Sequence, residues 1–521
     1  MSILRYTASL DNTITNAFEE NLTTRGTGSN MGASDILEVF SIYGQSHSAS
    51  VELSRVLIQF PLSQVTSDRN AGLLPASGSV TWKLKLYNAP HYTTTPRSYD
   101  IKVSAVSASW QEGIGLDMEH YTDLTKDNNG SNWIKRAGAT SWNSIGGDYH
   151  ANSSSLQSFD SGLEDLNIDV SGIVEKWLTG SNSWNNYGFG IRFSDSYEGY
   201  FSSSTGLDVT SSGDVTGSNL TADIGSIHNT DGATDSYYTK KFYGRGTEFF
   251  FKRPVLEAQF NDSTKDDRGN FYISSSLLPA ADNLNTLYFY NKFRGRLVDI
   301  AGDSTKLPVL KLYYSSGSVP EGDPRGFQDQ TGSATTFLTA SRVSTGTYKA
   351  QVAITSSIIT NNYQYLMDVW SFGGQEVLTG SVITPKTFRP ETYEDSTNFV
   401  LSMTNLKPEY GKNDLAKLRL YAREKNWSPN IYTVAKTKPE NKLIISGSYK
   451  VIRMIDDLTV VDYGTGSVKY TELSYDQNGN YFEFNMDMLE PGYQYGFKFS
   501  IYDEYTQSYL EQPYLFKFRV S

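Results

Sequence analysis

Apolar and polar residues alternate along much of this chain. The stretches VTWKLKLY (80–87) and YGFKFSIY (495–502) show the pattern most clearly. Apolar residues occupy every second position there: Val80, Trp82, Leu84 and Leu86 in the first, and Tyr495, Phe497, Phe499 and Ile501 in the second. Successive side chains of a strand point to opposite faces, so this period of two predicts half-buried β-strands.

Helical periodicity is scarce, and the best case is DVSGIVEKWLTG at 169–180. In a helix, Ile173, Val174, Trp177 and Leu178 would form one apolar stripe, and Gly180 stands where the helix would end. The pattern predicts a single short helix that closes one end of a β-sandwich.

Composition extends this prediction to the whole chain. Its 521 residues include 36 tyrosines and 26 phenylalanines, and aromatic side chains suit the pleated, half-buried surface of a sheet. The fold class that we expect is therefore all-β, with tandem β-sandwiches: a jelly-roll-like N-terminal domain followed by two Ig-like or fibronectin type III-like domains.

Two changes in composition divide the chain. NDSTKDDRGN (261–270) is polar and rich in turn residues, which is typical of a linker, and it follows a strand-like segment. Pro385 and Pro390 mark a second boundary. We expect three domains, at 1–262, 263–384 and 385–521.

The net charge of −12 argues against two classes of partner. Coating nucleic acid requires a basic face, and so does electrostatic attachment to anionic lipid. No apolar run is long enough to cross a bilayer, and the first residues do not resemble a secretory signal. We therefore expect no nucleic-acid partner and no membrane insertion. The protein should stay in the cell that makes it or leave by assembly or lysis.

Motifs for catalysis are absent from the sequence. There is no cysteine, no His-x-His or His-Glu-x-x-His zinc motif, and no Gly-x-Ser-x-Gly nucleophile elbow. A pair of carboxylates for glycoside hydrolysis stays open, because their separation is set only by the fold. We expect a protein that is not an enzyme.

Seven motifs in the first half follow one another in the order found in a known family. They are TGSNMGASDILEV, SRVLIQFPLS, VTWKLKLYNAP, VSASWQEGIG, TSWNSIGGDYH, IDVSGIVEKWLTGSNSWNNYGFGIRF and KRPVLEAQF. Together they resemble the DNRLRE family of carbohydrate-binding-like β-sandwich modules over residues 5–260, and residues 202–235 depart from that pattern as an insertion. The resemblance implies a jelly-roll-like sandwich with Trp110 at a strand end and Glu112 in a loop at its edge.

Tryptophans in this region divide into two groups. Trp82 and Trp177 lie in apolar-patterned segments and are expected in the core. Trp133, Trp142 and Trp184 lie in polar loops, so we expect them to be the better candidates for exposed rings that stack on a sugar.

The last domain contains LEPGYQY (489–495), whose spacing resembles the tyrosine corner of fibronectin type III and related sandwiches. That resemblance implies a hydrogen bond from the Tyr495 hydroxyl to the backbone upstream. The middle domain's STGTYKAQVAI (344–354) resembles bacterial immunoglobulin-like modules.

Residues 6–45 and 248–271 resemble structural proteins of tailed phages that infect marine bacteria. This resemblance implies a virion protein, assembled in the host bacterial cytoplasm, that decorates the tail, neck or head. Its partners would be other virion proteins and copies of itself. The alternative hypothesis is an adhesin that binds host surface polysaccharide through its N-terminal sandwich.

The acidic stretch WQEGIGLDMEHYTD (110–123) admits two interpretations. Glu112 can accept hydrogen bonds from backbone N–H groups and fix a metal-free structural loop. Alternatively, Asp117, Glu119 and Asp123 are spaced as calcium ligands often are. We expect the structural loop, and no cofactor unless calcium binds here.

Overall fold

The structure is a computed structural model that describes residues 2–22, 25–44, 50–92, 97–116, 130–180, 184–201, 208–209, 215–216, 226–235, 237–358, 364–387, 399–425, 441–503 and 506–521. The chain forms two compact units: an N-terminal unit, Ile3–Phe260, and a C-terminal unit, Asn261–Ser521 together with Met1–Ser2. Almost all of the regular structure is strand, and nearly all strand pairs are antiparallel. The prediction of an all-β chain of tandem β-sandwiches is confirmed.

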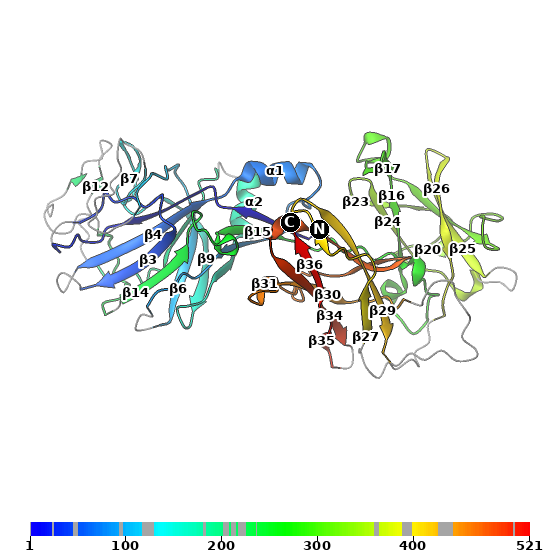
Figure 1. Ribbon diagram of the computed structural model, residues 1–521. Helices are drawn as coiled ribbons and strands as arrows, with labels where there is room; N and C mark the ends of the chain where they lie inside the picture. The colour runs from blue at the N-terminus through cyan, green and yellow to red at the C-terminus, as the bar shows by residue number, and fades with distance from the viewer. Residues whose placement is uncertain are drawn as a thin grey trace. The chain divides into compact units, whose positions relative to one another are not determined.

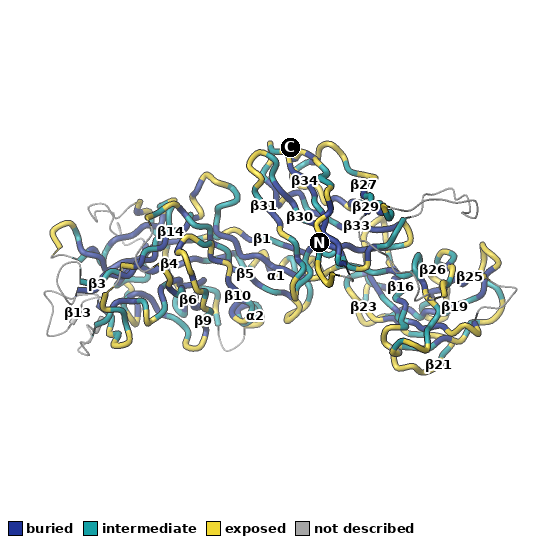
Figure 2. The backbone as a smooth tube through the Cα atoms, turned by 90° about the horizontal axis from the view of Figure 1, so that it is seen from below, coloured by how far each residue is buried: buried dark blue, intermediate teal, exposed yellow. Residues whose placement is uncertain are grey.

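Two sheets build the N-terminal unit. The first has the order β1 (Ile3–Thr7), β15 (Val255–Gln259), β5 (Thr81–Leu86) and β10 (Leu166–Asp169). The second has the order β14 (Tyr237–Tyr243), β3 (Ile36–Tyr43), β4 (Val51–Gln59), β11 (Phe189–Phe193), β6 (Tyr99–Val106) and β9 (Tyr149–Phe159), and β2 (Leu10–Thr15) also pairs with β4. Their facing apolar side chains form one core, in which Trp82, Leu84 and Leu86 are fully buried. Buried residues follow the strands in Figure 2.

Two α-helices lie in the described part of the chain, α1 (Leu62–Asn70) and α2 (Ser171–Thr179). Helix α2 confirms the predicted helix: Ile173, Val174 and Trp177 are buried, and Gly180 ends it at a φ of 63°. The expectation of a single helix is wrong, because α1 also forms; it buries only Val65 and so has no apolar stripe that would mark it in the sequence. Glu175 of α2 accepts hydrogen bonds from the Trp82 indole at 2.9 Å and from Arg69 of α1 at 2.8 Å. No helix among the described residues is long and apolar enough to cross a membrane.

The C-terminal unit contains two pairs of sheets. In the first pair, one sheet has the order β16 (Asn285–Tyr290), β24 (Thr347–Val352), β23 (Ser341–Ser344). Its partner sheet has the order β22 (Leu338–Thr339), β19 (Val309–Ser315), β25 (Tyr365–Phe372), β26 (Gln375–Ile383). In the second pair, one sheet has the order β27 (Phe399–Met403), β29 (Leu415–Glu424), β33 (Gly479–Asn485), β32 (Ser474–Asp476). Its partner sheet has the order β28 (Glu409–Tyr410), β36 (Phe516–Val520), β34 (Gln494–Asp503), β30 (Gly447–Arg453), β31 (Leu458–Val461), and β35 (Ser508–Glu511) also pairs with β34.

The tyrosine corner expected at Tyr495 is present in this second pair. The Tyr495 hydroxyl donates to the Glu490 carbonyl at 2.8 Å, which is the contact that such a corner requires.

Residues 264–268 differ from a free linker, because they pack between the two sandwiches of the C-terminal unit. The Asp266 amide donates to the Tyr475 carbonyl of β32 at 3.1 Å, and the Tyr475 amide donates to the Thr264 carbonyl at 3.0 Å. Arg268 forms ion pairs with Asp266 and, at 2.5 Å, with Asp368 of β25. These last three residues are called the Arg268 triad below. The division into three domains stays a prediction.

Candidate functional site

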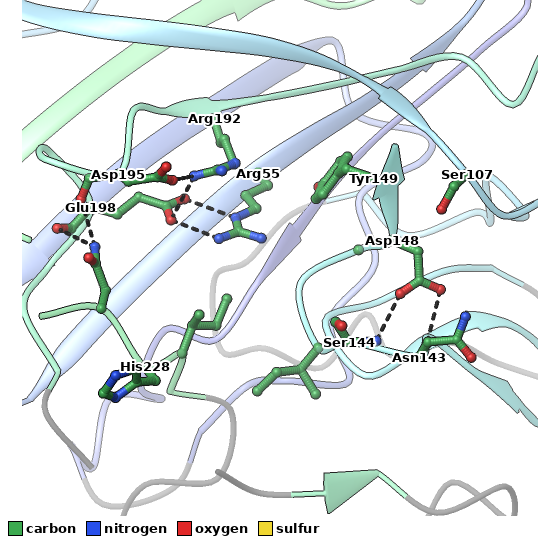
Figure 3. Close-up of a pocket in the computed structure, with 14 residues that line it drawn as sticks. Arg55, Ser107, Asn143, Ser144, Asp148, Tyr149, Arg192, Asp195, Glu198 and His228 are labelled. Carbon is green, nitrogen blue, oxygen red and sulfur yellow. Dashed lines mark hydrogen bonds and ion pairs between the residues drawn. The ribbon is translucent and has the colours of Figure 1, made fainter. Parts of the chain in front are cut away.

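A polar pocket of about 520 Å³ opens in the N-terminal unit. One wall comes from residues 143–149 and the other from residues 192–198 and 227–229, with Arg55 of β4 between them (Figure 3). The lining residues are mostly polar or charged: Arg55, Ser107, Asn143, Ser144, Asp148, Tyr149, Arg192, Asp195, Glu198, His228 and Asn229, with Ile145, Gly147 and Ile227.

A buried ion pair forms part of the lining of this pocket. The Arg55 Nε and Nη2 atoms donate to the two carboxylate oxygens of Glu198 at 2.9 and 2.7 Å, and Nη1 donates to the Gly146 carbonyl at 3.0 Å. Burial alone would lower the pKa of Arg55, but the Glu198 carboxylate outweighs it and raises that pKa. Arg55 therefore stays charged, and its bonds to Glu198 and Gly146 join β4 to both walls of the pocket.

Asp195 supplies an exposed carboxylate at the pocket. Its Oδ1 atom accepts a hydrogen bond from Arg192 Nη1 at 2.6 Å, and Arg192 also reaches Glu198 at 3.2 Å. Burial would raise the pKa of Asp195, but the positive charges of Arg192 and Lys102 lower it overall. Asp195 is therefore ionised at neutral pH and can accept hydrogen bonds from a ligand.

The opposite wall is held by Asp148. Its carboxylate accepts the backbone N–H groups of Asn143 and Ser144 at 2.9 and 2.8 Å, which fixes the turn that carries those two polar side chains. The Tyr149 hydroxyl donates to the Gly146 carbonyl at 2.9 Å, and burial raises the pKa of that tyrosine. Tyr149 is thus a neutral structural donor.

Hydrogen bonding is what this pocket offers chemically. Asn143 and Ser144 on one wall and Asp195 on the other are suited to a neutral, polyhydroxylated ligand. Within the described ranges, no three His, Cys, Asp or Glu side chains are grouped as metal ligands. Sequence reasoning missed this pocket, because its two walls are more than 40 residues apart in the chain.

Two of the three tryptophans expected on the surface are in the interior instead. Trp133 and Trp142 are fully buried in a second apolar cluster of the N-terminal unit, so the expectation of exposed rings is wrong for both. The Trp142 indole donates to the Asn132 carbonyl at 2.9 Å, and Arg55 lies over the Trp133 ring at 5.4 Å. Their polar flanking residues form turns that fold over this cluster, and no ring face remains for a sugar.

Trp184 is half-buried, and other groups already stack on it. The His150 ring lies 4.1 Å from it, nearly parallel, and the Lys176 ammonium lies over it at 4.3 Å. A sugar could stack on Trp184 only if one of these groups moved. Glycan binding by Trp184 stays a prediction.

Glu112 is held by partners that sequence reasoning did not find. Its carboxylate accepts the Asp11 backbone N–H at 2.8 Å and two bonds from Arg245, at 2.6 and 2.7 Å. Arg245 also lies 3.7 Å from the Asp11 carboxylate, and Asp11, Glu112 and Arg245 are called the Arg245 triad below. Neighbouring Trp110 is buried and donates to the Tyr187 carbonyl at 2.7 Å. Both residues therefore fix the edge of the sandwich.

The calcium candidates Asp117, Glu119 and Asp123 lie outside the described residues. No signal in the sequence points from Glu112 to Arg245, which is 133 residues away.

No protein-family model matches this chain, and no curated protein matches it. Among solved structures, it is similar to extracellular domains 3–5 of Drosophila OTK. The sequence identity is 9%, the match covers 46% of this chain and 60% of the OTK chain, and the TM-score is 0.14. It is also similar to a marsupial T cell receptor (9% identity, 46% and 69% covered, TM-score 0.15) and to the FN1–FN3 domains of chicken CNTN1 (9%, 54% and 76%, TM-score 0.14). The chain thus spans less than two thirds of the OTK structure. TM-scores this low do not establish a shared fold.

Proposed function

We propose that this chain is a non-enzymatic structural protein of a phage virion, held at the tail, neck or head by contacts with other virion proteins and with its own copies. The observation that supports this most is how its buried charges are used. Arg55 with Glu198, and the members of the Arg268 triad, join separate strands and loops of the sandwiches. Buried ion pairs of this kind make a fold rigid, which suits a structural protein.

The proposal also rests on the resemblance to structural proteins of tailed marine phages and on the serial arrangement of sandwiches. An acidic chain disfavours contact with packaged nucleic acid, so the contacts that hold it would be between proteins. Assembly would take place in the cytoplasm of the host bacterium.

Mass spectrometry of purified particles tests this function. We expect this chain to copurify with the particles at a fixed ratio to the main capsid protein, through density gradients and salt washes. The chain would be excluded as a virion protein if it were abundant in infected cells but missing from purified particles.

The pocket at Arg55 favours a second candidate function, binding of a host surface polysaccharide. Its support is the set of hydrogen-bonding side chains on the two walls, Asn143 and Ser144 on one and Asp195 on the other. Titration of polysaccharide into the full chain should give saturable binding that Asp195→Ala weakens, whereas Asp160→Ala, an exposed control in the same unit, should not. Equal binding by wild type and Asp195→Ala would remove the pocket from consideration.

A further inference from the structure

A short hairpin in the C-terminal unit carries positive charge in an acidic protein. Strands β17 (Lys292–Phe293) and β18 (Arg296–Leu297) follow β16 and stand at the end of its sheet (Figure 1). The segment KFRGRL (292–297) contains three cations and no acid, and all six of its residues are exposed.

The two-residue turn of this hairpin keeps a cation where other residues fit more easily. Arg294 has a φ of 50° and Gly295 a φ of 81°, the left-handed pair that such tight hairpin turns need. Asparagine or glycine adopts this conformation at less cost than arginine. A third positive charge, that of Arg294, thus stands at the tip although the left-handed backbone conformation there disfavours arginine.

One face of the hairpin combines apolar and cationic groups. Phe293 faces Arg296 across the two strands, and the Arg294 guanidinium lies 5.3 Å from the centre of the Phe293 ring. Phe293 is 63% exposed, which is a large apolar surface to leave in water. Aromatic and arginine side chains together are typical of the centre of a protein–protein interface.

None of these three cations forms an ion pair with another described residue, whereas Arg268, Arg342, Arg419 and Arg453 of the same unit all do. At the base of the hairpin lies Lys417, which is paired with Glu483 at 3.9 Å. Burial chiefly lowers the pKa of Lys417, and Lys292 is one of the positive neighbours that lower it further. The unpaired charge thus faces outward, with an apolar anchor at its centre.

The negative charge that would complement this hairpin is present in every copy of the chain. Most of the net negative charge of −12 falls in residues 1–260, so the N-terminal unit is strongly acidic and the C-terminal unit is nearly neutral. Oppositely charged surfaces of this kind attract each other and set the orientation of contact.

We infer that the hairpin at 292–297 docks on the acidic N-terminal unit of a second copy of this chain. This inference rests on the proposed role in an assembly and names one contact within it. Because the two surfaces are different, the contact is head-to-tail, and repetition would build a ring or a row of copies.

Sedimentation velocity of the full chain tests the inference. Wild type should associate at about 50 mM salt and dissociate at about 500 mM salt, where charges are screened. The variant Phe293→Ser/Arg294→Asn/Arg296→Gln should associate at least about tenfold more weakly. A matched variant at two exposed lysines of the same unit, Lys412→Gln/Lys517→Gln, should behave as wild type.

The inference is overturned if wild type stays monomeric at both salt concentrations. It is also overturned if the hairpin variant associates as strongly as the lysine control variant. Retention of wild type on dextran sulfate without self-association would assign the hairpin to an anionic polysaccharide instead, and would also overturn it. A chain that copurifies with virions but does not self-associate would refute this contact and leave the proposed function intact.

A photo-crosslinking residue at position 293 locates the contact in a mixture of light and heavy-isotope full chains. Links between chains should reach residues 1–260. Links between chains that reach only residues 261–521, or no such links, would contradict the docking.

Discussion

The Arg245 triad and the Arg268 triad contain the same groups, one arginine and two carboxylates, but they differ in their contact with water. The side chain of Arg245 is 40% exposed, whereas that of Arg268 is 9% exposed and its partner Asp368 is fully buried. The first triad fixes a loop at the edge of the N-terminal sandwich. The second joins two sandwiches within the C-terminal unit.

Each triad has two carboxyl groups for one arginine, and in each the pKa of one aspartate is raised. Burial raises the pKa of Asp11 to about 7, and the Glu112 charge adds to this shift. Burial likewise raises the pKa of Asp266 to about 6, with a contribution from Asp368. Asp11 is as buried as Asp266, so the triads differ in the other two groups: water can reach Arg245 and, in part, Glu112, whereas both carboxylates of the second triad stay dehydrated when the arginine is lost.

Arg268→Ala should have the largest effect. Without its guanidinium, Asp266 and Asp368 are buried without a countercharge, and we expect a loss of about 3–5 kcal/mol of unfolding free energy in the C-terminal unit. Calorimetry of the full chain would show a lower melting temperature for that unit alone. Joint loss of both transitions would instead indicate that the two units do not unfold separately.

Tyr495→Phe measures a neutral hydrogen bond in the same unit as the Arg268 triad. The change leaves the Glu490 carbonyl without its donor and should cost about 1–3 kcal/mol. Thermal unfolding should show a smaller decrease than for Arg268→Ala. Tyr493→Phe is a control next to the corner, and an effect as large as that of Tyr495→Phe would argue against a specific role for the Tyr495 hydroxyl.

Glu112→Ala should destabilise the N-terminal unit by only about 1–2 kcal/mol. The Asp11 N–H loses its acceptor, but Asp11 also loses a repulsive neighbour and Arg245 is partly hydrated. Urea unfolding followed by tryptophan fluorescence would report the change, with the exposed Glu248→Ala as a control. A loss of more than about 3 kcal/mol would mean that water does not compensate at this site.

The pH dependence of stability should distinguish the triads by a smaller amount. The folded-state pKa values of Asp11 and Asp266 lie above the ordinary aspartate value of 3.8, so the folded state binds a proton more tightly than the unfolded chain does. The stabilisation from protonation therefore grows as pH falls from 7 towards 4 and is lost as pH rises through the folded pKa. From pH 7 to 6, we expect about 1 kcal/mol from Asp11 and about 0.4 kcal/mol from Asp266.

Asp11→Asn and Asp266→Asn should each remove one of these contributions when melting temperatures are compared at the two pH values. A pH response that neither variant changes would show that other groups titrate.

Removal of metal ions should have the smallest effect. The Glu112 oxygens already accept bonds from Arg245 and the Asp11 N–H, so the described part of the 110–123 stretch is held without a metal. A chelator should leave the melting temperature of the N-terminal unit nearly unchanged. A fall of many degrees that calcium reverses would make Asp117, Glu119 and Asp123 a metal site.

Local patterns in the sequence predicted part of the local structure, although they did not mark α1. The alternation at 80–87 and 495–502 marked β5 and β34, and the apolar stripe before Gly180 marked α2. These features depend on neighbours a few residues apart, where strand and helix periods act directly.

Long-range pairing could not be predicted in the same way. Trp133 and Trp142 lie among polar residues in the sequence, and only the path of the chain in the folded protein directs their rings into the core. Arg55 and Glu198 are 143 residues apart, and Arg268 and Asp368 are 100 apart. The choice of partner depends on the order of strands in the sheets, which one sequence does not record.

The most direct test compares Arg245→Ala with Arg268→Ala in urea unfolding of the full chain at pH 7. If burial decides the role of each triad, Arg268→Ala should cost its unit at least about 2 kcal/mol more than Arg245→Ala costs the N-terminal unit. Equal losses, or a larger loss for Arg245→Ala, would contradict this explanation.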